Sequence, residues 1–169
     1  MKILFTEEQI KKRVYETAQK LNKFYKGEEV IAICTLKGGV IFTSDLVRHL
    51  DMPLKMEFIR LSSYGSSTET SGKVNAVDIK LPDLNGKNVL IIEDIVDTGL
   101  TAKFLVDFIN MNFRVKDLKF CSLLDKKITR RVDIHPDLYC FDVENQFVVG
   151  YGLDYDGLYR NLPYIAEKE

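Results

Sequence analysis

The chain has few cysteines and no long apolar runs. Its three cysteines, Cys34, Cys121 and Cys140, are odd in number, widely spaced and without any Cys-x-x-Cys pair. This pattern argues against a disulfide framework and indicates reduced thiols in a reducing compartment. The opening segment MKILFTEEQIKK carries only a short apolar run before acids begin, so no signal peptide is expected. No apolar stretch approaches membrane-spanning length, and the expected location is the cytoplasm.

The chain also lacks an excess of charge of either sign. Lysine and arginine total 24 against 25 acids, for a formal net charge of -1. A global signal for nucleic-acid or membrane binding is therefore missing. With 169 residues, 46% of them hydrophobic, the chain is expected to form one domain, residues 1–169, around a sizeable core.

Helical and strand-like patterns alternate along the chain. A capping-box pattern at Thr6 and Gln9 predicts a helix that stops near Gly27. A second helix is predicted from the spacing of Phe42, Leu46 and Leu50, and a serine- and threonine-rich loop over 62–74. A third helix is predicted over 100–112, and strands over 30–36, 54–61, 74–81, 87–94, 118–124, 138–143 and 147–152.

This alternation predicts an α/β fold with a central, mainly parallel sheet flanked by helices. Ligands of such folds bind beyond the carboxyl ends of the strands. Residues 37–39, 93–101 and 125–127 each follow or end a predicted strand. We therefore expect these three segments to surround one cleft.

The stretch VLIIEDIVDTGLTA, residues 89–102, combines two kinds of binding group. A strand followed by a glycine loop and a helix aims backbone N–H groups outward, and Thr98 and Thr101 add hydroxyls, which suits an anion. Glu93, Asp94 and Asp97 would repel phosphate unless they face sugar hydroxyls or a divalent cation. The stretch therefore indicates a phosphorylated sugar with Mg²⁺.

Other interpretations of this stretch compete. Asp97 and Thr98 could simply cap the helix that follows. A response-regulator receiver would place its acids on different strands, whereas these acids follow one strand. A nucleotide P-loop needs Gly-x-x-x-x-Gly-Lys-Ser/Thr, which is absent.

The same stretch resembles the phosphoribosyl-pyrophosphate motif of the type I phosphoribosyltransferases. Three further stretches, LKGGVIF, SSYGSST and FVVGYGLDYDGLYRNLPYI, resemble the hypoxanthine-guanine phosphoribosyltransferases of the compact bacterial type. The resemblance runs from about residue 30 to the C-terminus. It implies a twisted sheet with a small hood, to which N-terminal residues and roughly residues 125–169 contribute. It also implies transfer of the phosphoribosyl group of 5-phosphoribosyl pyrophosphate to hypoxanthine or guanine.

The resemblance assigns the sugar-phosphate contacts to the central motif. Glu93 and Asp94 would engage the ribose hydroxyls and Mg²⁺, and Asp97 would handle the purine proton as the catalytic residue. Leu100 stands where some relatives carry lysine, so one charge fewer would face the phosphate. The implied ribose and 5′-phosphate contacts are Glu93, Asp94, Asp97, Thr98, Gly99, Leu100 and Thr101.

Pyrophosphate contacts are implied in three other segments. The Lys37–Gly38 bond would be cis, with backbone donors facing pyrophosphate, and Ser63 and Tyr64 would close over the site. Without the resemblance, these segments would be a tight turn and an ordinary surface loop. Arg160 would bind pyrophosphate through its planar fork.

The base would be held by residues after the motif. Lys126 would donate to the six-oxo oxygen of the purine, Phe147 would stack on the ring, and Val148 would offer backbone groups. Asp154 completes the implied purine-binding set and is also the second implied Mg²⁺ contact, beside Glu93 and Asp94. The simpler alternatives are a surface lysine, a core phenylalanine and a surface salt bridge.

Two other functions stay open. The enzyme could prefer xanthine, or the chain could be a nucleic-acid-binding regulator on the same fold. Such a regulator should show a basic face, and the one candidate is the short run DKKITRRV, residues 125–132. Apart from Lys126, this run is interpreted as solvated surface or a subunit contact, so nucleic acid is not expected. The family implies a homodimer or homotetramer.

Overall fold

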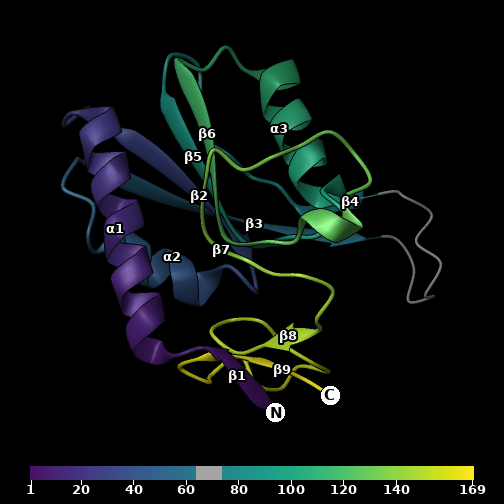
Figure 1. Cartoon of the computed structure of the whole chain (residues 1–169). Helices are drawn as coiled ribbons and strands as arrows, with labels where there is room; N and C mark the ends of the chain where they lie inside the picture. The colour runs from purple at the N-terminus through teal and green to yellow at the C-terminus, as the bar shows by residue number, and fades with distance from the viewer. Residues whose placement is uncertain (64–73) are drawn as a thin grey trace.

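The protein is built around one large, mainly parallel sheet. The structure, a computed structural model, describes residues 1–63 and 74–169. The sheet has six strands in the order β4-β3-β2-β5-β6-β7 (Figure 1). Five of them are parallel and β4 runs antiparallel to β3, which confirms the predicted fold class. The strands are β2 (Val30–Leu36), β3 (Leu54–Ser63), β4 (Val74–Asp78), β5 (Asn88–Val96), β6 (Asp117–Asp125) and β7 (Leu138–Asp142).

A second, smaller sheet forms the hood. Its three strands are antiparallel in the order β1-β9-β8. Figure 1 shows this sheet beyond one end of α1, with both chain termini beside it. Segments from the two ends of the chain therefore meet in one layer. They are β1 (Lys2–Phe5), β8 (Val148–Val149) and β9 (Ile165–Glu167).

Helices cover both faces of the large sheet. Because side chains alternate along a strand, Ala32 packs with α1 (Glu7–Tyr25) and α2 (Val40–Val47) on one face. Its neighbour Ile33 packs with α3 (Leu100–Asn112) on the other face. The strands are thus apolar on both sides, as the sequence indicates. One further turn, η1 (Lys127–Thr129), follows β6.

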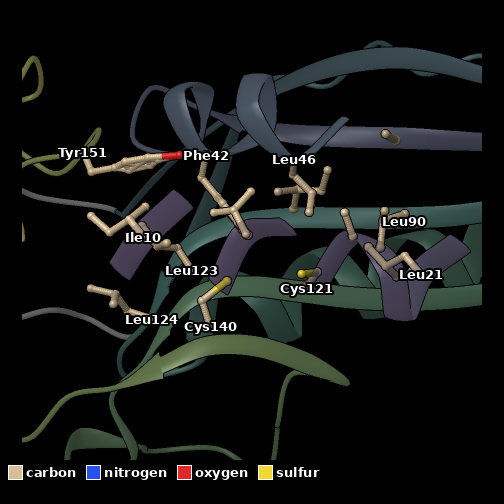
Figure 2. Close-up of a cluster of buried hydrophobic side chains, with 14 of the residues drawn as sticks. Ile10, Leu21, Phe42, Leu46, Leu90, Cys121, Leu123, Leu124, Cys140 and Tyr151 are labelled. Atoms are coloured by element: carbon tan, nitrogen blue, oxygen red, sulfur yellow. The ribbon is translucent and has the colours of Figure 1, made fainter. Parts of the chain in front are cut away.

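The core beneath α1 and α2 is closely packed and contains buried sulfur. Figure 2 shows Leu21 of α1 and Leu46 of α2 among side chains from the sheet. Cys34, Cys121 and Cys140 are all buried and free. Burial raises the pKa of each thiol, to about 11 for Cys140. These cysteines are therefore packing residues.

Local signals fix several element boundaries. The capping box at the start of α1 is confirmed: the backbone N of Gln9 donates to Thr6 Oγ1 (3.2 Å), and the backbone N of Thr6 donates to Gln9 Oε1 (2.9 Å). The predicted second helix ends at Val47, before Leu50, which was the last residue of its apolar spacing. The side chain of Asn22 in α1 binds the backbone that follows the helix. The Asn22 side chain donates to the carbonyl of His49 and accepts from the N–H of Asp51, at 3.0 Å each. Within the described residues, no helix is both long and apolar enough to cross a membrane.

Replacement of Ile109 by alanine tests how far α3 depends on its buried face. Ile109 has no exposed surface, whereas Met111 on the same helix is 84% exposed. We expect Ile109→Ala to lower the free energy of unfolding by about 2–5 kcal/mol through lost burial and a cavity. Met111→Ala should change it by less than about 0.5 kcal/mol. Urea denaturation of both variants measures the difference, and equal effects would contradict this packing.

Candidate functional site

The candidate site lies where β2, β5 and β6 end. These strands are adjacent and parallel, so the loops that follow them leave the sheet at one edge. A cavity of about 260 Å³ opens there. The cavity therefore lies where two of the three predicted segments meet. Its lining comes from Thr35, Leu36, Gly38, Leu61, Glu93, Asp94, Ile95, Val96, Asp97, Thr98, Gly99, Thr101 and Ala102.

Two acids at the end of β5 are held close together. Glu93 is 5% exposed, and its Oε2 accepts a hydrogen bond of 2.6 Å from Thr35 Oγ1. Burial, together with the neighbouring charge of Asp94, raises the pKa of Glu93 to about 8. Burial also raises the pKa of Asp94, although Arg160 and the backbone N–H of Ile95 oppose the shift. The positive charge of Arg160 therefore does not fully offset the burial of Asp94.

The acid pair fits a magnesium ion. The second oxygen of Glu93, Oε1, is buried and has no hydrogen-bond partner within the structure as described. Mg²⁺ takes hard oxygen ligands, commonly one or two carboxylates together with oxygens of a phosphorylated substrate. The part of the chain that the structure describes contains no group of three acidic, histidine or cysteine side chains placed to hold an ion. Glu93 and Asp94 would therefore need oxygens from the substrate to complete a Mg²⁺ site.

The loop after β5 is shaped as an anion site. Gly99 precedes α3 with φ of +86°, and its position as N-cap carries no side-chain cap. The N-terminal backbone of α3 and the Thr101 residue line the cavity. Thr98 Oγ1 accepts from the backbone N of Leu100 at 3.3 Å, so capping accounts for part of the role of Thr98.

The side chain of Asp97 binds another loop and does not cap α3. Its Oδ1 accepts a hydrogen bond from the hydroxyl of Thr129, in the turn η1 after β6. Asp97 itself lines the cavity. The one acid expected to move a proton is thus oriented by a hydroxyl from a neighbouring loop.

The interpretation of 125–132 as solvated surface or a subunit contact is wrong for Asp125 and Arg130. Asp125 and Arg130 form an ion pair, and their side chains are only 1% and 9% exposed. Thr129 contacts Asp97 as described above. The run has a basic composition, yet part of it is buried beneath the loop that follows β5.

The loop after β2 also differs from expectation in one detail. The cis peptide bond joins Leu36 and Lys37, rather than Lys37 and Gly38. Gly38 lies so close to the acids that a Cβ there would come within 1.8 Å of Asp94 Oδ2. Glycine at this position therefore lets the loop approach the acid pair.

The loop between β8 and β9 packs onto this turn. A Cβ at Gly152 would lie 2.3 Å from the carbonyl oxygen of Gly38. Arg160 donates to the carbonyl of Gly152 at 2.6 Å and pairs with Asp154 at 3.2 Å. The ion pair named as the alternative for Asp154 and Arg160 is therefore present. It stands next to the acids, since the charges of both residues act on Asp94.

Residues predicted to bind the base meet at the start of β8. Lys126 Nζ donates to the carbonyl of Gln146 at 3.2 Å, next to Phe147. Phe147 is 52% exposed and packs edge-on against Tyr155, with ring centroids 5.7 Å apart. The alternative that Phe147 is a core residue is wrong. Val148 is buried in β8.

The predicted closing loop is described only at its edge. The backbone of Ser63 ends β3, whereas Tyr64 lies outside the described residues. Sequence reasoning also missed several supporting residues, namely Thr35, Thr129, Arg130 and Gly152. Their contacts depend on pairing between distant segments, and the sequence carries no local signal for them.

The family profile and the most similar relatives all relate this chain to the phosphoribosyltransferases. A family profile for the phosphoribosyl transferase domain matches residues 2–156. The hypoxanthine-guanine phosphoribosyltransferase of Bacillus subtilis is 44% identical over 165 residues, which cover 98% of this chain and 91% of that protein. The enzyme of the same name from Aquifex aeolicus is 44% identical over 164 residues, covering 96% and 92% of the two chains.

Solved structures agree with the sequence relatives. A crystal structure of a hypoxanthine-guanine phosphoribosyltransferase from Bacillus anthracis superposes with a TM-score of 0.94 at 43% identity, over 100% of this chain and 99% of the other. A hypoxanthine phosphoribosyltransferase from Staphylococcus aureus also gives 0.94, at 38% identity over 100% and 91%. The chain therefore belongs to the phosphoribosyltransferase family, and within it to the group of the hypoxanthine-guanine enzymes.

Proposed function

We propose that the chain transfers the phosphoribosyl group of 5-phosphoribosyl pyrophosphate to hypoxanthine or guanine, forming IMP or GMP and pyrophosphate in purine salvage. The bond from the anomeric carbon to pyrophosphate breaks, and a bond from that carbon to a purine ring nitrogen forms. The observation that carries this proposal is the buried acid pair beside the anion loop that follows β5, at the same edge of the sheet. That combination suits a sugar carrying hydroxyls at one end and a phosphate at the other.

Each part of the sugar substrate has matching residues. Glu93 and Asp94 would accept hydrogen bonds from the ribose hydroxyls and hold Mg²⁺, which would neutralise charge on the departing pyrophosphate. The backbone of Asp97–Thr101, with the hydroxyls of Thr98 and Thr101, would bind the 5′-phosphate. Pyrophosphate would meet Lys37, Gly38 and Arg160, with Ser63 and Tyr64 closing over it, and Asp154 would serve as a second magnesium contact.

The base would bind between Lys126 and the aromatic side chain of Phe147. The ammonium of Lys126 would exchange its carbonyl partner on Gln146 for the six-oxo oxygen of the purine. The exposed ring of Phe147 would stack on the base while the backbone of Val148 contacts its edge. Asp97 would take the purine proton as the new bond forms.

A parallel assay with four bases separates the remaining alternatives. Purified protein is given 5-phosphoribosyl pyrophosphate, Mg²⁺ and either hypoxanthine, guanine, xanthine or adenine. We expect nucleotide from hypoxanthine and guanine, since Lys126 donates to an oxo group and would repel the amino group of adenine. A faster rate with xanthine would establish the xanthine-preferring alternative. A folded protein that binds the sugar phosphate but makes no nucleotide would instead support the regulator.

The wider setting is part of the proposal. The buried free thiols are consistent with a reducing compartment, and we place the enzyme in the cytoplasm. We propose that the chain acts as a single unit, with a hood from its N-terminal residues and roughly residues 125–169, and that it assembles as a homodimer or homotetramer.

Replacement of Asp97 tests the proton transfer. Asp97→Asn keeps the size of the side chain but removes its basic oxygen. We expect kcat to fall by about 100-fold or more, with little change in the affinity for the sugar phosphate. Steady-state kinetics and equilibrium binding measure the two effects. Asp133→Asn, at a side chain 98% exposed, serves as control; full turnover in Asp97→Asn would remove Asp97 from the proton step.

Replacement of Lys126 tests recognition of the base. Lys126→Ala removes a donor to the purine oxygen, a charged hydrogen bond worth about tenfold or more in affinity. We expect KM for guanine to rise by this amount while KM for 5-phosphoribosyl pyrophosphate stays within about twofold. Lys12→Ala, whose side chain is 81% exposed, is the control. Equal weakening of both substrates would show that Lys126 does not face the base.

Chelation of magnesium tests the acid pair. We expect removal of Mg²⁺ to weaken binding of 5-phosphoribosyl pyrophosphate by about tenfold or more in the unmodified protein. Glu93→Gln preserves the shape and an oxygen for Thr35 but loses the charge, so its binding should respond less to Mg²⁺. Glu144→Gln, on the exposed surface, is the control. Calorimetric titration with and without chelator gives the comparison, and an unaltered response in Glu93→Gln would exclude this pair as the magnesium site.

A further inference from the structure

The loop after β5 is held from one side by a single segment, Lys126–Arg131. Three consecutive carbonyl groups, at the end of β5 and in the first two residues of the loop, accept hydrogen bonds from that segment, so their oxygens all point toward it. The bonds join Lys126 N to Val96 O (2.9 Å), Arg130 Nε to Asp97 O (3.1 Å) and Arg131 N to Thr98 O (2.8 Å).

Fixing these carbonyls also fixes the N–H groups of the loop. In a trans peptide unit the C=O and the following N–H point in opposite directions, and the described cis bond lies elsewhere, between Leu36 and Lys37. The N–H groups of Asp97, Thr98 and Gly99 therefore point away from the segment Lys126–Arg131. The cavity is lined by these three residues and not by that segment. Three consecutive donors are thus directed toward the proposed phosphate position.

Arg130 supplies the side-chain part of this arrangement. Its guanidinium donates to the carbonyls of Asp97 (3.1 Å) and Val96 (3.4 Å) and also to Ile134 O. The same group is paired with Asp125, and both side chains are almost fully buried. The planar guanidinium of Arg130 therefore links the end of β6 to the end of β5 and to the segment that follows η1.

The position of Gly99 shows how closely Arg130 fits the loop. A Cβ on Gly99 would lie 2.8 Å from Arg130 Cδ and 2.5 Å from Ile134 Cγ2. The aliphatic part of the Arg130 side chain thus packs directly against the residue that precedes α3. The loop is confined both by hydrogen bonds and by contact.

We propose that Arg130 is a positioning residue that preorganises the phosphate loop, a role that rests on the proposed phosphoribosyl transfer. It acts through geometry and not through charge, because Asp125 neutralises the guanidinium within the same buried pair. Leu100, the first residue of α3, is uncharged and likewise adds no positive charge to the phosphate site. Affinity for the 5′-phosphate then depends on how firmly the three N–H groups are aimed before the ligand arrives.

A pair of ligands that differ only in the phosphate isolates this effect. The dissociation constants of GMP and guanosine are measured for the unmodified protein and for Arg130→Lys, which keeps the charge but lacks the fork. We expect GMP binding to weaken about tenfold and guanosine binding by less than about twofold. Partial unfolding lowers both apparent affinities by the same factor, so the ratio is insensitive to it. Arg114→Lys, at an exposed arginine, is the control.

Asp125→Asn separates geometry from charge and remains informative if Arg130→Lys fails to fold. Losing the carboxylate loosens the anchor of Arg130 but frees its positive charge. The proposal predicts a lower preference for GMP over guanosine, whereas a higher preference would show that Arg130 acts by charge and would overturn it. An unchanged ratio in either folded variant would also overturn it. If the unmodified protein binds GMP no more tightly than guanosine, the proposed phosphate site fails and the role of Arg130 fails with it; a lost preference only in the variants concerns Arg130 alone.

Discussion

Parallel hydrogen bonding of β5 to its two neighbours brings the acid pair, the anion loop and the groups that hold them to one edge of the sheet. Ile92 pairs with Cys34 of β2, and Val96 pairs with Asp125 of β6. The three strands therefore end together, and their loops meet at one edge of the sheet. A slip of one residue would move Glu93 to the opposite face of the sheet, away from Thr35. The apolar side chains on both faces of β5 hold the register, so the packing of the core also sets the chemistry.

A second set of residues supports those that would touch substrate. Thr35 holds Glu93, Thr129 holds Asp97, and Arg130 holds the backbone between them. Each of these supporting groups comes from a different strand end than the residue it holds. The acids consequently stand in fixed positions although they carry unfavourable neighbouring charge. Such a site needs little rearrangement when a charged substrate arrives.

The sequence was sufficient for features with a local cause. The bounds of β2 and α3, the capping box of α1 and the anion loop after β5 all follow from short-range patterns and are present. The family relationship was also visible in four short stretches. The burial of Arg130 was not predictable, because four basic residues within Lys126–Arg131 favour a solvated surface unless the buried partner of Arg130 is known. Strands β1 and β9 were missed because each is short and finds its partner at the far end of the chain.

The burial of the cysteines has a practical consequence for experiments on this protein. All three thiols lie inside the core, and their raised pKa values keep them protonated and slow to react at neutral pH. A cysteine introduced on the surface, for example in place of Met111, would react far faster than any native thiol. A fluorescent or spin label could then be attached at one chosen position without first removing the natural cysteines.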